Sequence, residues 1–500
     1  GARGLLAVTL QKQGRKAEAR ALLDDTLKHD PLDAWARWMR GRLEGCDGQT
    51  RLDLAHDLAR AGLFREALDC IKGGGGEDAP TRGGSERRAF PSDPRNLGTR
   101  PLVRYTRAWL HLKLGQTPDA MAELDRAAKE PAAYCFPARL EEIQVLEWAM
   151  RLNPEDARAP YYLGNLLYDR RRHPEAIRLW ELSARLDPSF PTVWRNLGIA
   201  CYNILGRPAR ARTCYERAVG ADTGDARLVY ERDQLWKRLG VAPARRRREL
   251  AQHQTAVRQR DDLSLEWCAL HNQLGDAAVA QAVLSERRFQ PWEGGEGQVF
   301  AQHVRTQLSL GYAALGAGDA ARAQAHFAWA LEAPDNLGEA RHFHASTAEI
   351  EYALGLACDA RGDAARAREH WRRATREVGD FQEMGLRDLG PATFFAALAH
   401  GRLREVRRSR DGFESLVRGA RVMRRTKASI DYFATSLPTL LLFQDDLNSR
   451  QRTQADVLEA MGCLGLGRRA RGRTLLRRVL QHSPDHAAAM DLLRRLELLL

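Results

Sequence analysis

The sequence lacks the paired cysteines and the long hydrophobic runs that mark several classes of protein. Its eight cysteines stand singly, and no Cys-x-x-Cys pair suggests zinc or redox chemistry; they are residues 46, 70, 135, 201, 214, 268, 358 and 463. The longest hydrophobic patch, Leu437 to Phe443, is short and carries a proline, whereas a membrane span needs about 18 apolar residues. No signal peptide is recognisable, and the chain opens at Gly1, without Met, inside a helical pattern. We therefore expect a reduced, cytoplasmic protein and a sequence that is a piece of something longer.

Motifs for common enzyme chemistry are also missing. No Gly-Lys pair occurs, which excludes a P-loop, and neither His-Glu-x-x-His nor Gly-x-Ser-x-Gly is present. His342 and His344 lack the spacing that places two zinc ligands on one helix face, as do His482 and His486. We expect no catalytic residues, no metal and no cofactor.

Lysine is scarce in a strongly basic chain. Only eight of the 78 basic residues are Lys, although the net charge is +13. The Arg residues are dispersed, which favours a solvated surface over a nucleic-acid site. RNA or DNA binding stays an alternative, because basic residues cluster in two segments of the sequence. The first is Arg245 to Arg248. The second is the set Arg418, Arg421, Arg424, Arg425 and Lys427, whose spacing of three and four puts them on one helix face.

Composition predicts helices rather than sheets. Ala, Leu and Arg dominate, while the β-branched residues are thin. At 500 residues the chain is also too long for one hydrophobic core, which favours several domains or a repeat array. We expect an all-α protein without β-sheet.

A repeat of 34 residues is visible where Leu163-Gly164 superposes on Leu197-Gly198. This period is that of the tetratricopeptide repeat, a pair of helices called A and B. A small residue at position 8 of helix A lets helix B cross closely, and a large apolar residue at position 24 fills the remaining space; in the first copy these are Gly164 and Trp180, with Ala176 at position 20 and Pro188 at position 32. The same spacing from small residue to small residue recurs in further copies, at Ala7 and Ala19, Ala108 and Ala120, Gly311 and Ala323, Gly355 and Ala367, and Ala460 and Gly472, and, after a one-residue insertion, at Gly198 and Ala211. Seven copies predict an α-solenoid, a right-handed superhelix of helix-turn-helix repeats.

Glycines mark the turns between the helices of a repeat. Gly115, Gly206, Gly275, Gly318 and Gly362 each follow a predicted helix A, where a left-handed residue is needed. The polar residue after each glycine is expected to cap helix B.

The pattern divides the chain into seven segments. We expect N-terminal repeats over 1–72, a flexible Gly/Pro-rich insertion over 73–100, central repeats over 101–286, an ordered connection over 287–300, repeats over 301–377, irregular helical repeats over 378–450, and a last repeat with a capping helix over 451–500. The connection is expected to be ordered because Phe289 and Trp292 give it apolar groups to bury.

Several unusual strings resemble one bacterial family. They are Tyr134-Cys135-Phe136-Pro137, Ala159 to Tyr168, Phe190 to Gly198, and Pro291 to Gly297. These strings are similar to the C-terminal repeat region of large tetratricopeptide proteins whose N-terminal half is an uncharacterised domain, similar to the β-sandwich of sugar mutarotases. The resemblance implies an alternative function, as the accessory region of a carbohydrate-active protein whose β-sandwich is absent from this chain.

The leading hypothesis is a scaffold that binds a protein or peptide partner on the concave face of the superhelix. Positions 2, 5, 9 and 12 of each helix A project into that face. The predicted partner-binding residues are Arg158, Tyr161, Asn165, Tyr168, Arg195, Asn196, Tyr202, Arg227 and Tyr230. We expect Tyr161, Asn165, Arg195, Tyr202 and Tyr230 to be exposed, and Leu163, Gly164, Ala176, Trp180, Trp194, Leu197 and Gly198 to be packed between helices.

Asn165 and Asn196 also match the Asn positions of a carboxylate clamp that some tetratricopeptide domains use for chaperone C-termini. Tyr161 and Glu231 do not match that clamp, and Arg227 stands where a Lys is usual. The favoured alternative is that the two asparagines brace neighbouring repeats.

Overall fold

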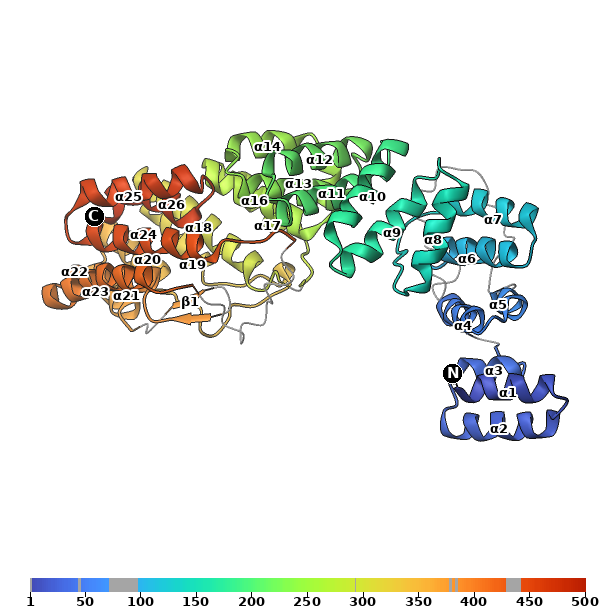
Figure 1. Ribbon diagram of the computed structural model, residues 1–500. Helices are drawn as coiled ribbons and strands as arrows, with labels where there is room; N and C mark the ends of the chain where they lie inside the picture. Colours follow the sequence, from blue (N-terminus) through green and yellow to red (C-terminus); the bar gives the residue numbers. More distant parts are fainter. Residues whose placement is uncertain are drawn as a thin grey trace. The chain divides into compact units, whose positions relative to one another are not determined.

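The computed structural model describes residues 2–43, 46–71, 98–292, 294–376, 380–382, 385–428 and 442–500, and helices dominate these ranges (Figure 1). The chain forms two compact units, Gly1–Ala200 (unit 1) and Cys201–Leu500 (unit 2). The predicted all-α solenoid is confirmed. The glycines of the predicted insertion, Gly73 to Gly76 and Gly83-Gly84, lie outside the described residues, as does the stretch 429–441 of the predicted irregular repeats.

Unit 1 is built from successive helices joined by short turns. They are α1 (Ala2–Lys12), α2 (Lys16–His29), α3 (Ala34–Met39), α4 (Gly48–Arg60), α5 (Phe64–Ile71), α6 (Arg100–Lys113), α7 (Thr117–Lys129), α8 (Glu141–Leu152), α9 (Arg158–Asp169), α10 (His173–Leu186) and most of α11 (Pro191–Asn203).

Unit 2 continues in the same manner to the C-terminus. Its elements are α12 (Pro208–Ala221), α13 (Ala226–Arg238), α14 (Pro243–Ala251), α15 (Gln254–Gln259), α16 (Asp261–Leu274), α17 (Ala277–Glu286), α18 (Gln298–Gly316), α19 (Ala320–Trp329), the 3-10 helix η2 (Asp335–Leu337), α20 (Ala348–Ala360), α21 (Ala364–Ala374), strands β1 (Asp380–Gln382) and β2 (Gly385–Arg387), α22 (Pro391–Arg402), α23 (Val406–Arg425), α24 (Leu447–Gly465), α25 (Arg469–His482) and α26 (Ala487–Leu499).

One short hairpin corrects the expectation of a chain without β-sheet. Strands β1 and β2 pair antiparallel, with Phe381 opposite Leu386, in the connection between α21 and α22. The pairing is local and three residues long on each side, so helical periodicity elsewhere gave no sign of it. The all-α class is unaffected.

The glycine at position 8 of helix A lets helix B pack closely against it, as the repeat pattern predicts. A Cβ atom added to Gly164 would lie 2.5 Å from Nε1 of Trp180, and one added to Gly355 would lie within 2.4 Å of Cδ1 of Trp371. At Gly311 the same construction meets the Phe327 ring at 2.5 Å. In these three repeats the aromatic ring of helix B therefore lies directly against the backbone of helix A, an approach that leaves no room for a Cβ atom.

The predicted turn glycines all have the left-handed conformation. Their φ angles run from +59° at Gly206 to +93° at Gly275. In the repeat formed by α9 and α10 the equivalent residue is Arg171, with a φ of +63°. The predicted helix caps form at Asp319 and Asp363, whose side chains accept from backbone N–H groups at 2.9 and 3.0 Å, whereas Gln116, Arg207 and Asp276 make no such cap.

The segment between α17 and α18, where the sequence predicts an ordered connection, buries an aromatic ring. Phe289 is buried, its N–H donates to the carbonyl of Asn336 at 2.8 Å, and Asn336 in turn donates to Leu284 and Arg287 carbonyls. Trp292 is half-buried against the same cluster.

Candidate protein-binding surface

Two neighbouring A helices, α9 and α11, carry seven of the predicted partner-binding residues, and six of these belong to unit 1. Tyr161 corrects the prediction, because its side chain is only 5% exposed. Phe190, in the turn before α11, packs edge-on against the Tyr161 ring with centroids 4.7 Å apart, and Tyr162 covers another side at 5.3 Å. Tyr161 is therefore a buried packing residue of α9 rather than an exposed one.

Asn165 and Asn196 join the two helices. The Nδ2 atom of Asn196 donates to Oδ1 of Asn165 at 3.0 Å, and Nε1 of Trp180 donates to the same oxygen at 3.1 Å. The alternative in which these asparagines brace neighbouring repeats is thus confirmed. Both contacts use the oxygen of the half-buried Asn165 amide, and neither uses its Nδ2 donor.

Arg158 is held in place at the start of α9. Its guanidinium lies 3.6 Å from the centroid of the Phe190 ring and 3.2 Å from a carboxylate oxygen of Asp187. Both contacts restrict the side chain while leaving it half-buried.

Tyr168 and Arg195 complete the set in unit 1. The Tyr168 ring lies between His173 and Trp180, at centroid distances of 4.6 and 5.1 Å, and burial raises the pKa of its hydroxyl. Arg195, on α11, is half-buried and approaches Oδ1 of Asn196 at 3.5 Å.

The residues predicted to pack between helices do so with one exception. Trp194 is half-buried rather than enclosed. Its Nε1 donates to the carbonyl of Pro188 at 2.8 Å. The buried members are Leu163, Gly164, Ala176, Trp180, Leu197 and Gly198.

Three of the predicted residues belong to unit 2, Tyr202 at the end of α11 and Arg227 and Tyr230 on α13. Tyr202 was expected to be exposed, but it is half-buried under Phe443, whose centroid lies 5.3 Å away. Asn203 fixes that cover by donating to the Leu442 carbonyl at 2.9 Å and accepting from the Gln444 N–H at 2.9 Å.

Tyr230 and Arg227, both on α13, differ in environment. Arg227 is exposed, whereas Tyr230 is half-buried with the Arg260 guanidinium 5.8 Å from its ring centroid. Burial and the nearby carboxylates of Asp262 and Glu266 raise the pKa of the Tyr230 hydroxyl above its usual value.

In the first basic segment, Arg245 to Arg248, Arg245 and Arg248 are exposed but Arg246 is not part of the surface. Arg246 is 0% exposed and forms ion pairs with Asp233 at 2.5 Å and with Glu266 at 2.6 Å. Burial alone would raise the pKa of Glu266, but Lys237 and Arg246 lower it well below its usual range. Arg246 thus ties α14 to α13 and α16, and is inaccessible to nucleic acid.

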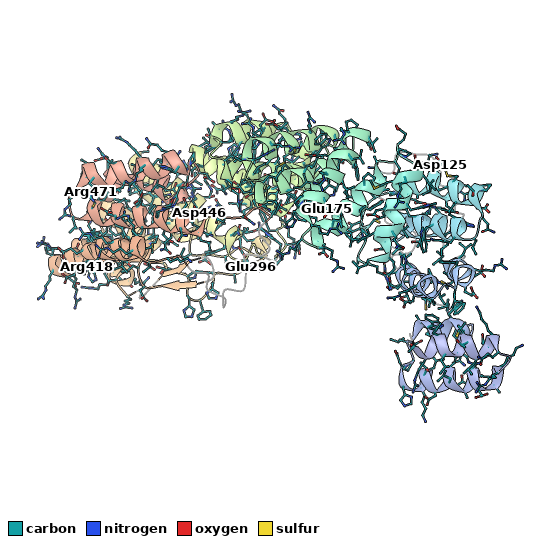
Figure 2. The ribbon with its side chains drawn as sticks, in the orientation of Figure 1. Asp125, Glu175, Glu296, Arg418, Asp446 and Arg471 are labelled. Atoms are coloured by element: carbon teal, nitrogen blue, oxygen red, sulfur yellow. The ribbon has the colours of Figure 1, made fainter. Side chains whose placement is uncertain are left out.

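The arginines of the second basic segment lie on α23, whereas Lys427 lies beyond the end of this helix and so does not share its face as predicted. Arg418, Arg421 and Arg425 are exposed, and Figure 2 shows Arg418 on this helix with Arg471 on α25. Arg424 instead pairs with Asp456 at 2.6 Å and with Glu459.

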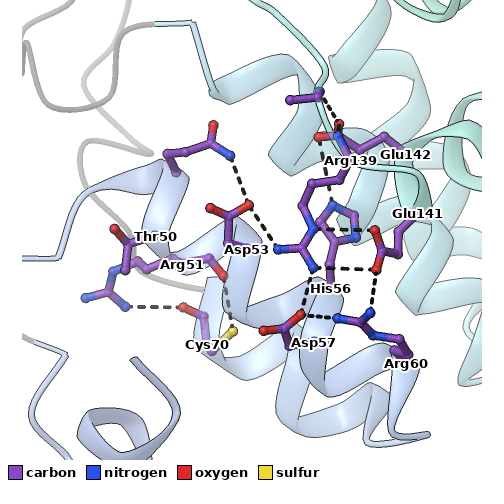
Figure 3. A network of polar contacts seen from close by, with 12 residues as sticks. Thr50, Arg51, Asp53, His56, Asp57, Arg60, Cys70, Arg139, Glu141 and Glu142 are labelled. Atoms are coloured by element: carbon purple, nitrogen blue, oxygen red, sulfur yellow. Dashed lines mark hydrogen bonds and ion pairs between the residues drawn. The ribbon is translucent and has the colours of Figure 1, made fainter. Parts of the chain in front are cut away.

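A network of charged side chains connects α4 to the start of α8 within unit 1 (Figure 3). Arg139 lies 2.7 Å from Asp57, 3.4 Å from Asp53 and 3.4 Å from Glu141. Beneath it, His56 and Glu142 are both buried, with Nε2 and Oε1 4.0 Å apart. Burial and the charge of Arg139 lower the pKa of His56 to about 4, while burial raises the pKa of Glu142. The network consists of ion pairs that hold α4 to α8.

Within the residues that the structure describes, no three His, Cys, Asp or Glu side chains are grouped as metal ligands. No helix there combines the length and the apolar character that crossing a membrane requires.

Comparison with family models identifies the repeats. One model, described as tetratricopeptide repeat, matches residues 5–44 and 143–191, and a second with the same description matches 101–126 and 348–373. The matched ranges include α9 with α10, and α20 with α21, two of the three pairs in which an aromatic ring contacts a glycine.

Similar solved structures include a tetratricopeptide repeat protein from Parabacteroides merdae, with 13% identity, a TM-score of 0.24, and coverage of 62% of this chain and 98% of that one. The anaphase-promoting complex hetero-tetramer Cut9-Hcn1 has 13% identity, a TM-score of 0.27, and coverage of 98% and 95%. MamA has 16% identity, a TM-score of 0.18, and coverage of 44% and 96%. Likenesses at such TM-scores carry no argument about function. On the family models and the helix pairing together, the chain is an all-α solenoid that contains tetratricopeptide repeats.

Proposed function

We propose that the protein is a non-catalytic scaffold that binds an extended segment of a partner protein on the surface formed by Arg158, Asn165, Arg195 and Asn196 of unit 1, here called the α9–α11 surface. Tetratricopeptide repeats typically mediate protein interactions, and these residues lie on A helices.

The observation that supports this proposal most is the fixed amide of Asn165. Its oxygen accepts from Trp180 and Asn196, so the orientation of its Nδ2 donor is set before any ligand arrives. Arg158, which packs on Phe190 and pairs with Asp187, and Arg195, which approaches Asn196, place guanidinium groups on the same two helices. Ordered polar groups lose little entropy on binding, and together they suit a peptide that offers backbone carbonyls and carboxylates.

The substitution Asn165→Asp tests the proposal with little risk to the fold. Aspartate keeps an oxygen for Trp180 and Asn196 but removes the Nδ2 donor. The matched control is Arg178→Gln, an equal change of net charge at an exposed position of α10. The assay is quantitative affinity capture by the full chain from lysate of the source cells, with circular dichroism to verify that each variant keeps its helices.

We expect Asn165→Asp to reduce capture of a defined set of proteins about tenfold, while Arg178→Gln captures them as the wild type does. Equal capture by all three chains would show that the α9–α11 surface is not the binding site.

A second candidate function rests on the exposed arginines of α23. Nucleic-acid binding there requires an affinity that falls steeply with salt and is lost on reversing the charges of Arg418, Arg421 and Arg425. Fluorescence anisotropy with a single-stranded oligonucleotide distinguishes it, because an unchanged affinity in the reversed variant removes this candidate.

A further inference from the structure

The C-terminal helix α26 does not simply stack on the repeat before it. In a solenoid each repeat contacts its neighbours in the sequence, but α26 lies beside α18 in unit 2 (Figure 1) and bonds to residues more than 140 positions earlier. Besides α25, its partners belong to the A helices α16, α18 and α20.

The contacted positions are those that the repeat register assigns to the concave face. With Gly311 at position 8 of α18, Arg305 is position 2 and Tyr312 is position 9. With Gly355 at position 8 of α20, Glu349 is position 2 and Tyr352 is position 5. All four contact α26, so α26 occupies the place where a repeat of this kind holds its ligand.

An acidic residue of α26 meets a basic residue of α18. Asp491 accepts from Arg305 at 2.8 and 3.1 Å, in a bidentate pair whose side chains are 13% and 10% exposed. Gln273 of α16 also accepts from Arg305, at 2.6 Å. A bidentate pair with little solvent access is specific for both partners.

The basic residues of α26 follow one helical turn later. Arg495 donates to Glu349 at 2.8 Å and to the Ser309 hydroxyl at 3.0 Å, and its guanidinium lies 4.8 Å from the Tyr312 ring centroid. Arg494 donates to the carbonyls of Asn272 and Gln273, at 2.9 and 2.6 Å, at the C-terminal end of α16. The Tyr352 hydroxyl then donates to the carbonyl of Leu499 at 3.0 Å.

Three leucines complete the pattern of α26. Leu492, Leu496 and Leu499 are buried, and their spacing of four and three puts them on one stripe of the helix. A helix that binds this surface thus needs an aspartate, a pair of arginines three and four residues later, and a leucine stripe.

We propose that the inner face of unit 2, formed by Arg305, Ser309 and Tyr312 of α18 with Glu349 and Tyr352 of α20, is a docking surface for an amphipathic helix of a partner protein, and that α26 occupies it in cis until that helix displaces it. The partner helix carries the pattern Asp-Leu-x-Arg-Arg-Leu-x-x-Leu, as α26 does. The surface is distinct from the α9–α11 surface, so either proposal can fail without the other.

The test uses the full chain and, as probe, a fluorescent peptide of the sequence 484–500. Wild-type chain should bind the peptide weakly, because only the fraction with α26 displaced can bind. The substitution Asp491→Arg in the chain removes the cis pair and leaves Arg305 for the aspartate of the peptide, so the affinity should rise at least about tenfold.

Two further variants make the result specific. Glu497→Arg applies the same charge change to α26, but Glu497 pairs with Arg469 and Arg473 of α25, so peptide affinity should stay at the wild-type value. The double variant Asp491→Arg with Arg305→Asp restores an ion pair in cis and opposes the aspartate of the peptide, so it should bind no better than wild type.

The proposal is overturned if Asp491→Arg and Glu497→Arg raise the affinity equally or not at all. It is also overturned if Asp491→Arg and the double variant both lose helicity, since α26 is then an inseparable part of the core. Formation of a stable dimer by Asp491→Arg that excludes the peptide would assign the surface to a second copy of this chain instead.

Discussion

Replacing Gly164 by alanine tests the contact on which the repeat depends. A Cβ atom at this position would lie 2.5 Å from Nε1 and 2.6 Å from Cδ1 of Trp180. The ring has little freedom to retreat, because it is 3% exposed and its Nε1 donates to Asn165 at 3.1 Å and to the Tyr161 carbonyl at 3.3 Å. The alanine therefore has to push α10 away from α9.

Two opposing effects determine how much Gly164→Ala changes the free energy of unfolding. Alanine in a helix interior is favoured over glycine by about 1 kcal/mol. Overpacking a filled core costs about 1 to 3 kcal/mol. Because the contact is with a constrained ring, we expect the upper part of that range, and a net loss of stability of about 1 to 2 kcal/mol.

The effect of Gly164→Ala on stability should reverse when the Trp180 ring is absent. Trp180→Ala alone removes a buried aromatic side chain and should destabilise by about 3 to 5 kcal/mol. In that background the new Cβ meets a cavity, so Gly164→Ala should stabilise by about 1 kcal/mol through helix propensity.

The assay is urea denaturation of the four chains, followed by far-UV circular dichroism, with hydrogen exchange of α9 and α10 peptides to localise the change. Gly220→Ala is the control, because Gly220 is helical and nothing lies within 4 Å of its added Cβ, so this change should stabilise slightly. If Gly164→Ala changes the unfolding free energy in the same direction with and without Trp180, the close approach of the ring to Gly164 does not determine the stability of this repeat.

Two further predictions concern unit 1. Arg171→Gly should stabilise the chain by about 1 kcal/mol, because Arg171 has a φ of +63° that favours glycine, and an unchanged or lower urea midpoint would contradict this. His56, whose folded pKa is lowered to about 4 from 6.5, contributes stability that is present above about pH 6.5 and lost as the pH falls through about 4. Compared with His56→Gln, the wild type should lose about 3 kcal/mol more unfolding free energy between pH 7 and pH 4, by the conversion of about 1.4 kcal/mol per unit of pKa. The raised pKa of Glu142 acts in the opposite direction, giving stability below about pH 4.5 that is lost as the pH rises through its folded value, and both chains share it. Parallel pH profiles for the two chains would refute the assignment to His56.

The helix pairs could be predicted from the sequence because their causes are local. A glycine at position 8, an aromatic residue 16 positions later and a left-handed glycine between them recur with a fixed spacing, as at Gly355, Gly362 and Trp371. The hairpin of β1 and β2 interrupts this periodicity without a comparable signal.

The candidate surface was only partly predictable, because burial there depends on residues outside the repeat. Tyr161 is covered by Phe190 from the following turn, and Tyr202 by Phe443, which is more than 230 positions away. The contacts of α26 with Arg305 and Glu349 likewise join segments whose separation in the sequence does not follow from the repeat length. The brace between Asn165 and Asn196, by contrast, follows from adjacent repeats and was predicted.

Site-specific photo-crosslinking tests the scaffold account most directly. A photoreactive amino acid is placed at Arg195 on the α9–α11 surface or, as the matched position, at exposed Arg178 on α10, and the chains are irradiated in source cells. The account predicts that the probe at position 195 forms discrete adducts with a partner protein, which Asn165→Asp diminishes, while the probe at 178 gives none of them. The same adducts from both positions, or adducts at 195 that Asn165→Asp leaves unchanged, would contradict it.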